Sequence, residues 1–373
     1  MEEFGSETAP LRPSHEEIEE GDFLEVNAAN SIQKGWSWWF VVALNSAFLL
    51  FGQVIGAMLG KFYFEYGGKS KWMATLVQTA GFPVLYIPVL FLRRPRNVDL
   101  NCPTSAQEAH IIVVCLVYIF LGVLLAADDL LYSLGLWYLP VSTYTLLCAT
   151  QLAFNALFSF FINSQKLTFF ILNSVFLLSI SAMLIALSNS SSDSKGVSNL
   201  RGTYLTGFIC TILASAIFAL YFSLTQLSFN KILRKETFSV VLDMQIYTSL
   251  VATCICAVGL FASGEASELK EDMDGFQKGK VLYVLGLVGT ALAWQAASVG
   301  ALGLIFLVSS LFSNVISMVT LPLVPIIAVI VYGEEMDGWI VVAMILAVWG
   351  CSSYFYQNYL DEKLASDQTP SQP

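Results

Sequence analysis

The sequence has few charged residues: Asp, Glu, Lys and Arg make up 12% of its 373 residues, whereas 56% are hydrophobic. Soluble domains carry about 25% charged residues, so this composition excludes an ordinary water-soluble protein. The apolar residues form blocks of about twenty, the length at which a helix crosses a bilayer core of roughly 30 Å. We therefore expect a single helix bundle embedded in a lipid bilayer.

Basic clusters are also absent, which excludes nucleic acid as a partner, because no run of Lys or Arg could neutralise phosphates. The two histidines, His15 and His110, are too few for histidine-rich metal chemistry. Six of the seven cysteines lie inside apolar blocks, where cysteine packs as a small hydrophobic residue. We expect no disulfide framework, no metal and no cofactor.

Ten apolar segments are expected to cross the membrane as helices. They are Trp36–Gly60, Trp72–Leu92, Ile111–Trp137, Ser142–Ile162, Leu167–Leu187, Thr203–Leu227, Phe238–Phe261, Val281–Leu302, Leu304–Tyr332 and Trp339–Tyr359. Residues 1–35 form an acidic tail expected to be disordered and cytoplasmic, and residues 360–373 form a polar C-terminal tail. An even number of spans places both termini on one side of the membrane.

The orientation depends on one glycosylation signal. The side of the membrane that holds the termini has ten Lys and Arg residues, and the other side has eight. This difference is too small to orient the protein by the positive-inside rule. Asn189 and Ser191 form an Asn-x-Ser acceptor in the Ser-rich loop 188–202. If Asn189 is glycosylated, this loop is extracytoplasmic and both termini are cytoplasmic. We expect a multi-pass protein of the plasma membrane in this orientation.

The sequence order repeats at half its length. Pro140-Val141-Ser142-Thr143 opens an apolar helix that is followed by a polar turn and another apolar helix, and Leu307-Val308-Ser309-Ser310 opens the same order about 167 positions later. Two units of five helices, 36–187 and 203–359, must enter the membrane from opposite sides because five is odd. Such inverted repeats place a ligand site near the midplane. Chance likeness among apolar helices is the alternative.

Ionisable side chains inside membrane helices are costly unless they meet a cavity or a partner, so each is a candidate site residue. Asp128 and Asp129 lie about nine residues, or about 14 Å, before the end of the third span near Trp137. Adjacent helical residues point about 100° apart, so one carboxylate can face a cavity and the other a neighbouring helix. A buried carboxylate can couple proton entry to solute movement. Alternatively, the helix ends earlier and both acids lie at a wet mouth.

Amide side chains recur inside the spans, and an amide can donate and accept hydrogen bonds with a nitrogen heterocycle. These are Gln78, Gln151, Asn155, Gln295 and Asn314. Trp294, Tyr132 and Phe222 could stack on the flat face of such a solute. For each amide, an interhelical hydrogen bond is the open alternative.

Lys and Arg are missing from the interiors of the spans, which favours a neutral or cationic solute over an anionic one. A nucleotide-sugar or organic-phosphate exchanger is the alternative within transport, and buried cationic residues would mark it. An intramembrane aspartyl hydrolase is the alternative of another class. It would need two carboxylates that meet across helices, for instance those of Asp128 and Asp243.

Several long strings resemble the plant purine permease family of the drug/metabolite transporter superfamily. They are Gly67–Trp72, Gln78–Pro83, Tyr138–Tyr144, Cys148–Asn155, Asn163–Lys166, Val308–Val315 and Trp349–Tyr354. The acidic pair followed by Tyr132 and Ser133 is similar to the family's acidic pair before a Leu-Tyr-Ser element. Gln53 is similar to the glutamine of the family's Gly-Gln pair in the first helix.

The resemblance implies an all-α fold of ten transmembrane helices in two inverted five-helix repeats. It also implies proton-coupled uptake of adenine-type purines, cytokinins and related heterocycles, with no enzymatic activity. The expected partners are therefore a small purine or cytokinin substrate, protons and the lipid bilayer. The expected substrate-binding residues are Gln53, Gln78, Tyr132, Gln151, Asn155, Trp294, Gln295 and Asn314, and the expected proton-coupling residues are Asp128 and Asp129.

Overall fold

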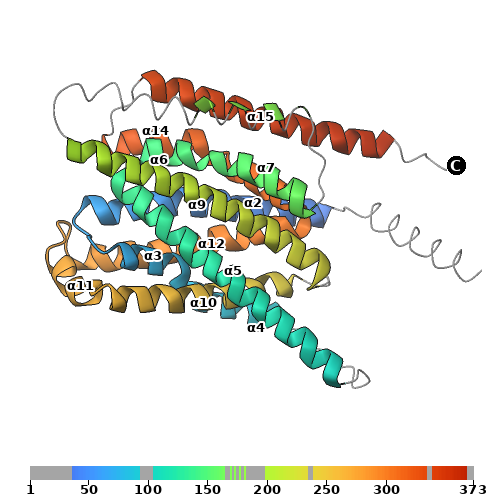
Figure 1. Cartoon of the computed structure of the whole chain (residues 1–373), viewed down its shortest axis with the longest axis horizontal. Helices are drawn as coiled ribbons and strands as arrows, with labels where there is room; N and C mark the ends of the chain where they lie inside the picture. The colour runs from blue at the N-terminus through green and yellow to red at the C-terminus, as the bar shows by residue number, and fades with distance from the viewer. Residues whose placement is uncertain are drawn as a thin grey trace, which may run out of the picture. The chain divides into compact units, whose positions relative to one another are not determined.

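The computed structural model describes residues 36–92, 104–163, 198–233, 238–333 and 338–367, together with seven single positions between 169 and 181. Every regular element in these residues is helical. The expected N-terminal tail, most of the expected span Leu167–Leu187 and the sequon at Asn189 lie outside them. Figure 1 shows the elements in chain order by colour.

The described elements begin with α2, as Figure 1 labels them. They are α2 (Trp36–Glu65), α3 (Lys71–Ala80), the 3-10 helix η1 (Phe82–Leu85), α4 (Tyr86–Leu92), α5 (Thr104–Tyr138), α6 (Val141–Cys148), α7 (Thr150–Asn163), α9 (Ser198–Lys231), α10 (Ser239–Ala262), α11 (Glu265–Asp274), α12 (Lys280–Leu307), α13 (Ser310–Ser317), α14 (Thr320–Tyr332) and α15 (Gly338–Asp367). The last helix therefore continues into the segment that was expected to be a polar tail.

Seven segments of the described residues are helical, long and apolar enough to cross a membrane. They are Trp38–Glu65, Lys71–Leu90, Ile111–Tyr138, Val141–Asn163, Gly202–Lys231, Ser239–Ala262 and Lys280–Leu307. Two shorter apolar helices, Leu323–Tyr332 and Gly338–Gly350, follow near the C-terminus. The expected class, a multi-pass all-helical membrane protein, is confirmed for the described residues, whereas the count of ten stays a prediction.

The contacts divide the chain into two units, Met1–Leu44 and Asn45–Pro373. The described part of the first unit is the beginning of α2, where Trp39 and Phe40 are exposed, as suits a lipid-facing surface. All packing and the site described below belong to the second unit.

Three of the expected spans are interrupted. The span Trp72–Leu92 is divided by Gly81 and η1 between α3 and α4, and the other two are interrupted at equivalent places. The expected span Ser142–Ile162 is divided at Ala149 into α6 and α7, and the span Leu304–Tyr332 is divided at Met318 and Val319 into α13 and α14. The eight-residue helices α6 and α13 begin 169 positions apart, at Val141 and Ser310, and each is followed by a helix of similar length. The segment Val141–Asn163 is still long and apolar enough to cross a membrane, as the sequence predicts, whereas the expected span Leu304–Tyr332 is not one continuous helix.

The hydrogen bonds at the two interruptions are also alike. The N–H of Ala149 donates to the carbonyl of Leu146 at 3.2 Å, and the N–H of Val319 donates to the carbonyl of Ile316 at 3.1 Å. Bonds that reach back three residues instead of four tighten the last turn of a helix. Apolar composition alone does not reveal such tightening, because the residues at both interruptions are as hydrophobic as their neighbours.

The expected boundary between the spans at Leu302 and Leu304 is also wrong, because α12 continues to Leu307. Ser309 sets the true boundary: its backbone is extended and its hydroxyl accepts a hydrogen bond from the N–H of Phe312 at 3.1 Å. A serine that caps the first turn of a helix in this way determines where the helix begins.

Helices α2 and α12 approach each other closely through small residues. A Cβ on Gly52 would lie 2.5 Å from the carbonyl oxygen of Ala293, and a Cβ on Gly300 would clash with the backbone of Asn45 and Leu49. Small residues allow membrane helices to pack backbone against backbone, with van der Waals contact in place of a hydrophobic driving force. Elsewhere in this unit α5 packs along α9 and α10, and α3 packs against α10 and α12 (Figure 1).

The acidic helix α11 is tied to the beginning of α3. One oxygen of Asp272 accepts hydrogen bonds from the N–H groups of Lys69 and Ser70 at 3.0 and 3.2 Å. One oxygen of Glu265 accepts hydrogen bonds from the Ser70 hydroxyl at 2.7 Å and from the N–H of Trp72 at 3.1 Å. These carboxylates satisfy N–H groups that have no partner within α3 itself. We call these four hydrogen bonds the α3 clasp.

Candidate functional site

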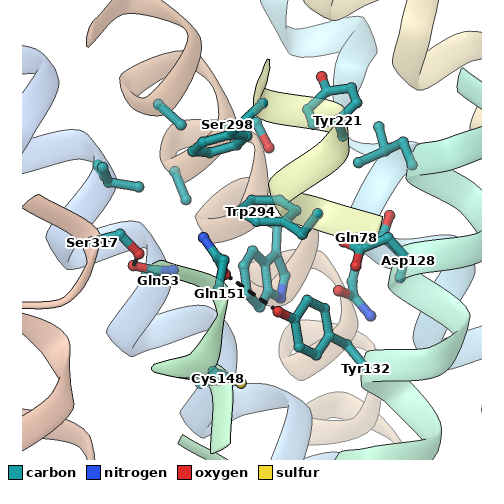
Figure 2. A pocket seen from close by; sticks show the side chains of 18 of the residues that line it. Gln53, Gln78, Asp128, Tyr132, Cys148, Gln151, Tyr221, Trp294, Ser298 and Ser317 are labelled. Atoms are coloured by element: carbon teal, nitrogen blue, oxygen red, sulfur yellow. Dashed lines mark hydrogen bonds between the residues drawn. The ribbon is translucent and has the colours of Figure 1, made fainter. Parts of the chain in front are cut away.

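A cavity of about 90 Å³ lies among the helices of the second unit. A volume of this size holds several water molecules. Side chains from both halves of the sequence line it, and Figure 2 shows many of them, with Trp294 among those labelled.

Most of the residues that the sequence singled out meet at this cavity. Its lining includes Gln53, Gln78, Asp128, Asp129, Tyr132, Gln151, Trp294 and Gln295. Asn155 and Asn314 are fully buried and lie outside the lining. Eight of the expected site residues therefore line one cavity. Contact between any of them and a substrate stays a prediction.

Asp128 and Asp129 are both buried and both line the cavity, with 1% and 8% of their surfaces exposed. The alternative in which both acids lie at a wet mouth is wrong, because α5 continues as a helix to Tyr138. Neither carboxylate oxygen of Asp128 has a hydrogen-bond partner in the described part of the chain. A buried carboxylate without partners is costly, so this side chain needs a proton, or a donor from a solute or water.

Gln151 joins the two interrupted helices. Its Nε2 donates to Oδ1 of Asn314 at 2.8 Å, and Nδ2 of Asn314 donates to the carbonyl of Gln151 at 3.3 Å. The hydroxyl of Tyr132 donates to Oε1 of Gln151 at 3.3 Å, the bond drawn in Figure 2. Asn314 therefore holds α7 against α13, whereas Gln151 and Tyr132 reach the cavity as a connected pair.

Asn155 belongs to a polar cluster behind the cavity, together with Ser159, Ser223 and Ser310. Its Nδ2 donates to the carbonyl of Ser310 at 3.2 Å, and its Oδ1 accepts from the hydroxyl of Ser223 at 3.0 Å. Gln226 extends the cluster by accepting from the N–H of Ser310 at 3.1 Å. The side chain of Asn155 therefore forms interhelical hydrogen bonds, which is the alternative that the sequence left open for each amide.

Gln53 and Gln78 line the cavity with part of their amides already bonded. Oε1 of Gln53 accepts from the hydroxyl of Ser317 at 2.9 Å, as Figure 2 shows. Nε2 of Gln78 donates to the hydroxyl of Ser133 at 2.8 Å and to the carbonyl of Ala74 at 3.2 Å. The atoms left to face a solute are the amide nitrogen of Gln53, a donor, and the amide oxygen of Gln78, an acceptor.

Aromatic rings form much of the remaining wall. The indole of Trp294 lies so close to α2 that a Cβ on Gly56 would be 2.9 Å from the ring. Phe218 and Phe222 pack with their ring centroids 4.3 Å apart, and Tyr132 packs edge-on against Phe218 at 6.3 Å. Flat aromatic faces and a few polar groups are the lining expected of a site for a planar solute.

The sequence reasoning missed several lining residues. They include Tyr144, Cys148, Tyr221, Gln245 and Ser249. Gln245 could have been found by the criterion that selected the other amides, because it lies within the expected span Phe238–Phe261. Asp243 is not among the lining residues, so the pair with Asp128 that a hydrolase would need is not formed there.

The chemistry of the lining limits what it can bind. No Lys or Arg belongs to the lining that the structure describes, and no cluster of metal-binding side chains occurs in that part of the chain. The wall combines two carboxylates, several amides and a set of aromatic rings. Such a wall can hold a planar solute with hydrogen-bonding nitrogen atoms, and it offers nothing to neutralise a phosphate.

Comparison with known proteins agrees with this chemistry. The family model described as purine nucleobase transmembrane transport matches residues 40–364. Probable purine permease 11 of Arabidopsis thaliana is 55% identical over 329 residues, which cover 88% of this chain and 85% of that protein. Probable purine permease 10 of the same plant is 50% identical over 91% of this chain and 85% of its own length. Purine permease 21 is 46% identical over 99% of this chain and 94% of its own length.

Proposed function

This chain belongs to the purine permease family and is a transporter rather than an enzyme, and we propose that it moves purine-type heterocycles together with protons. Adenine and cytokinins are the proposed substrates. The proposed architecture is ten transmembrane helices in two inverted five-helix repeats, 36–187 and 203–359, with the substrate between them. The equivalent interruptions at Ala149 and Met318 support it, since broken helices at corresponding positions are typical of inverted-repeat transporters.

The proposed substrate pose follows from the lining. Trp294 stacks on the flat face of the heterocycle, as aromatic side chains do on nucleobases. The amide nitrogen of Gln53 donates to a ring nitrogen, and the oxygen atoms of Gln78 and Asp128 accept from N–H groups. The remaining residues of the predicted set support this arrangement. Gln151 and Tyr132 do so from the cavity wall, whereas Asn155 and Asn314 do so from the helix contacts behind it.

The single observation that carries the proposal is the position of Asp128. This carboxylate lines the cavity, is 1% exposed and has no partner for either oxygen in the described residues. A proton relieves the cost of burying it, and the protonated carboxyl then offers a solute its O–H as a donor and its other oxygen as an acceptor, so proton binding favours solute binding. Proton binding at Asp128 and solute binding in the same cavity therefore affect each other, and this linkage is what couples the two movements. Asp129, on the same wall, is the second proposed proton-coupling residue.

The direct test is uptake of labelled adenine or trans-zeatin by host cells that lack purine transport of their own. Uptake should rise as the external pH falls and should collapse when a protonophore removes the proton gradient. Uptake that is unaffected by both treatments contradicts proton coupling but is consistent with purine transport. Failure to take up any purine-type heterocycle contradicts the proposed function itself.

The proposed location is the plasma membrane, with both termini in the cytoplasm. The support is the sequon at Asn189, because glycosylation of the loop 188–202 requires that it faces away from the cytoplasm. Treating the protein with an endoglycosidase should increase its electrophoretic mobility, and Asn189→Gln should remove this effect. Glycosylation that survives Asn189→Gln, or a terminal tag accessible from outside intact cells, contradicts the orientation.

A nucleotide-sugar or organic-phosphate exchanger is less consistent with the cavity. Its substrate would bring at least one negative charge against Asp128 and Asp129, and the lining that the structure describes contains no Lys or Arg to compensate. Burying such like charges together costs several kcal/mol. Competition by a nucleotide sugar against labelled adenine should therefore be absent.

A further inference from the structure

Gln295 is fixed in orientation by the end of α3. Its Nε2 donates to the carbonyl oxygens of Thr79 and Gln78 at 3.1 and 3.3 Å. Because α3 ends at Ala80, both carbonyls lie in its last turn, and the carbonyl of Thr79 also accepts from the N–H of Gly81. A rotated amide would place Oε1 against two acceptors, so only one orientation is stable. Gly81 permits the approach, since a Cβ there would lie 2.7 Å from Cγ of Gln295.

The orientation of Gln295 determines the orientation of Gln245. Oε1 of Gln295 is an acceptor, and Nε2 of Gln245 donates to it at 3.2 Å. The same nitrogen donates to the hydroxyl of Ser249 at 2.9 Å. Both hydrogens of the Gln245 amide are therefore used by the protein. Its Oε1 is buried and has no hydrogen-bond partner in the described residues.

The geometry points to Gln245 as a specificity-determining residue: its Oε1 is a fixed acceptor that selects solutes by an N–H group. This inference rests on the proposed function and assigns a role to a residue that the sequence reasoning did not single out. Gln245 lines the same cavity as Asp128 and Trp294 and is 1% exposed. A solute that donates to Oε1 satisfies a buried acceptor, whereas a solute without a hydrogen there leaves it unpaired.

Gln245 differs from Asp128 in one respect that matters for selectivity. In the described part of the cavity wall, the buried side-chain atoms without partners are Oε1 of Gln245 and the two oxygens of Asp128. Asp128 only accepts hydrogen bonds when it is ionised, whereas it both donates and accepts when it is protonated, so what it asks of a solute changes with its protonation state. The Gln245 amide does not titrate, and Gln295 prevents its rotation. Its preference for a donor therefore persists through the transport cycle.

The test compares adenine with two analogues that each lack one donor. Purine keeps the ring N–H of adenine but lacks the exocyclic amine, and 9-methyladenine keeps the amine but lacks the ring N–H. Each compound competes with labelled adenine for uptake by the wild-type carrier. The analogue without the hydrogen that faces Gln245 should compete about tenfold to a hundredfold more weakly than adenine, the range expected for one unpaired buried acceptor. If all three compounds compete equally well, the inference is overturned. This outcome can be measured with the wild-type carrier alone.

Two variants identify the residue responsible. Gln245→Met keeps the length of the side chain but removes the acceptor, so the weakened analogue should then compete as well as adenine. The quantity to compare is the ratio between the competition by adenine and the competition by the weakened analogue. Gln295→Met should reduce this ratio by a smaller factor than Gln245→Met does, because the Gln245 amide can then rotate. A general loss of structure would not change the ratio between two competitors, so the ratio separates selection from stability.

Thr253→Val is the matched control on the same helix. Thr253 donates to the hydroxyl of Thr79 at 2.9 Å and does not belong to the cavity lining. This variant should retain the wild-type ratio. A ratio that is unchanged in Gln245→Met while adenine uptake continues overturns the inference and leaves the proposed function intact. A wild-type carrier that takes up no purine at all contradicts the proposed function instead.

Discussion

Gln151 and Asn314, which are 163 positions apart in the sequence, form a two-way amide contact between α7 and α13. The Nε2 of Gln151 donates to Oδ1 of Asn314 at 2.8 Å, and the Nδ2 of Asn314 donates to the Gln151 carbonyl at 3.3 Å. Gln151 lies two residues after the interruption at Ala149, and Asn314 lies four residues before the interruption at Met318. The pair therefore joins the two broken helices directly.

Removing one member of this pair should destabilise the protein. Asn314→Leu leaves the Nε2 of Gln151 without its acceptor, at a cost of about 1–3 kcal/mol for a buried polar group. The double variant Gln151→Leu with Asn314→Leu should recover part of that loss, because neither amide is then left unpaired and the Tyr132 hydroxyl keeps its contact with Ser215 at 3.3 Å. Thermal unfolding in detergent measures both effects.

Ser352→Ala is the control for the amide pair, since Ser352 is exposed and its hydroxyl bonds only to the carbonyl of Val348 within α15 among the contacts described. It should leave the unfolding temperature unchanged. A double variant that is less stable than the sum of the two single variants contradicts the pairwise account.

Asp128→Asn should separate substrate binding from accumulation. Asparagine has a similar shape to a protonated aspartate but cannot release a proton, so net uptake driven by the proton gradient should be lost. Exchange of labelled for unlabelled adenine across the membrane should persist, because it needs no change in protonation. Asp243→Asn, outside the cavity lining, is the control and should accumulate adenine normally. Normal accumulation by Asp128→Asn would remove this residue from the coupling mechanism.

Trp294→Ala should weaken substrate binding. Stacking of a base on an aromatic side chain contributes about 1–3 kcal/mol, so the KM should rise by roughly ten- to a hundredfold, and Trp294→Phe should restore much of it. Trp349→Ala is the matched control, because Trp349 is 67% exposed on α15 and does not line the cavity. A KM that Trp294→Ala leaves unchanged would show that the solute does not stack on this ring.

The α3 clasp predicts a stability effect outside the cavity. Asp272→Ala leaves the N–H groups of Lys69 and Ser70 without their acceptor and should cost about 0.5–2 kcal/mol, the range for a lost helix cap. Glu268→Ala on the exposed side of α11 should have little effect. Thermal unfolding compares the two variants. Equal unfolding temperatures would mean that the clasp does not stabilise the fold.

Glycine substitutions should have opposite effects at two positions. Gly52→Ala places a methyl group 2.5 Å from the carbonyl of Ala293 and should separate α2 from α12, which lowers the stability. Gly202→Ala meets nothing within 4 Å near the start of α9 and should stabilise that helix by up to about 1 kcal/mol. Similar unfolding temperatures for the two variants would contradict this difference in packing.

Much of the cavity could be predicted from the sequence because polar residues are rare inside apolar helices. Gln53, Gln78 and Asp128 stand out in the printed sequence for that reason, and each lines the cavity. Helical periodicity also places Gln151 and Asn155 on one side of a helix. It could not tell that Gln151 reaches the cavity while Asn155 bonds to the backbone of α13, because the sequence does not reveal which helix covers that side.

The sequence by itself determined the membrane-embedded helical class, the apolar segments and the short set of costly polar side chains, since these follow from composition and residue spacing. Only the tertiary structure decided how each polar atom is used. It interrupted the helices at Ala149 and Met318, and it turned the Gln295 amide toward the carbonyls at the end of α3. The physical reason is that an amide has both donor and acceptor atoms, and its partner depends on where neighbouring helices end.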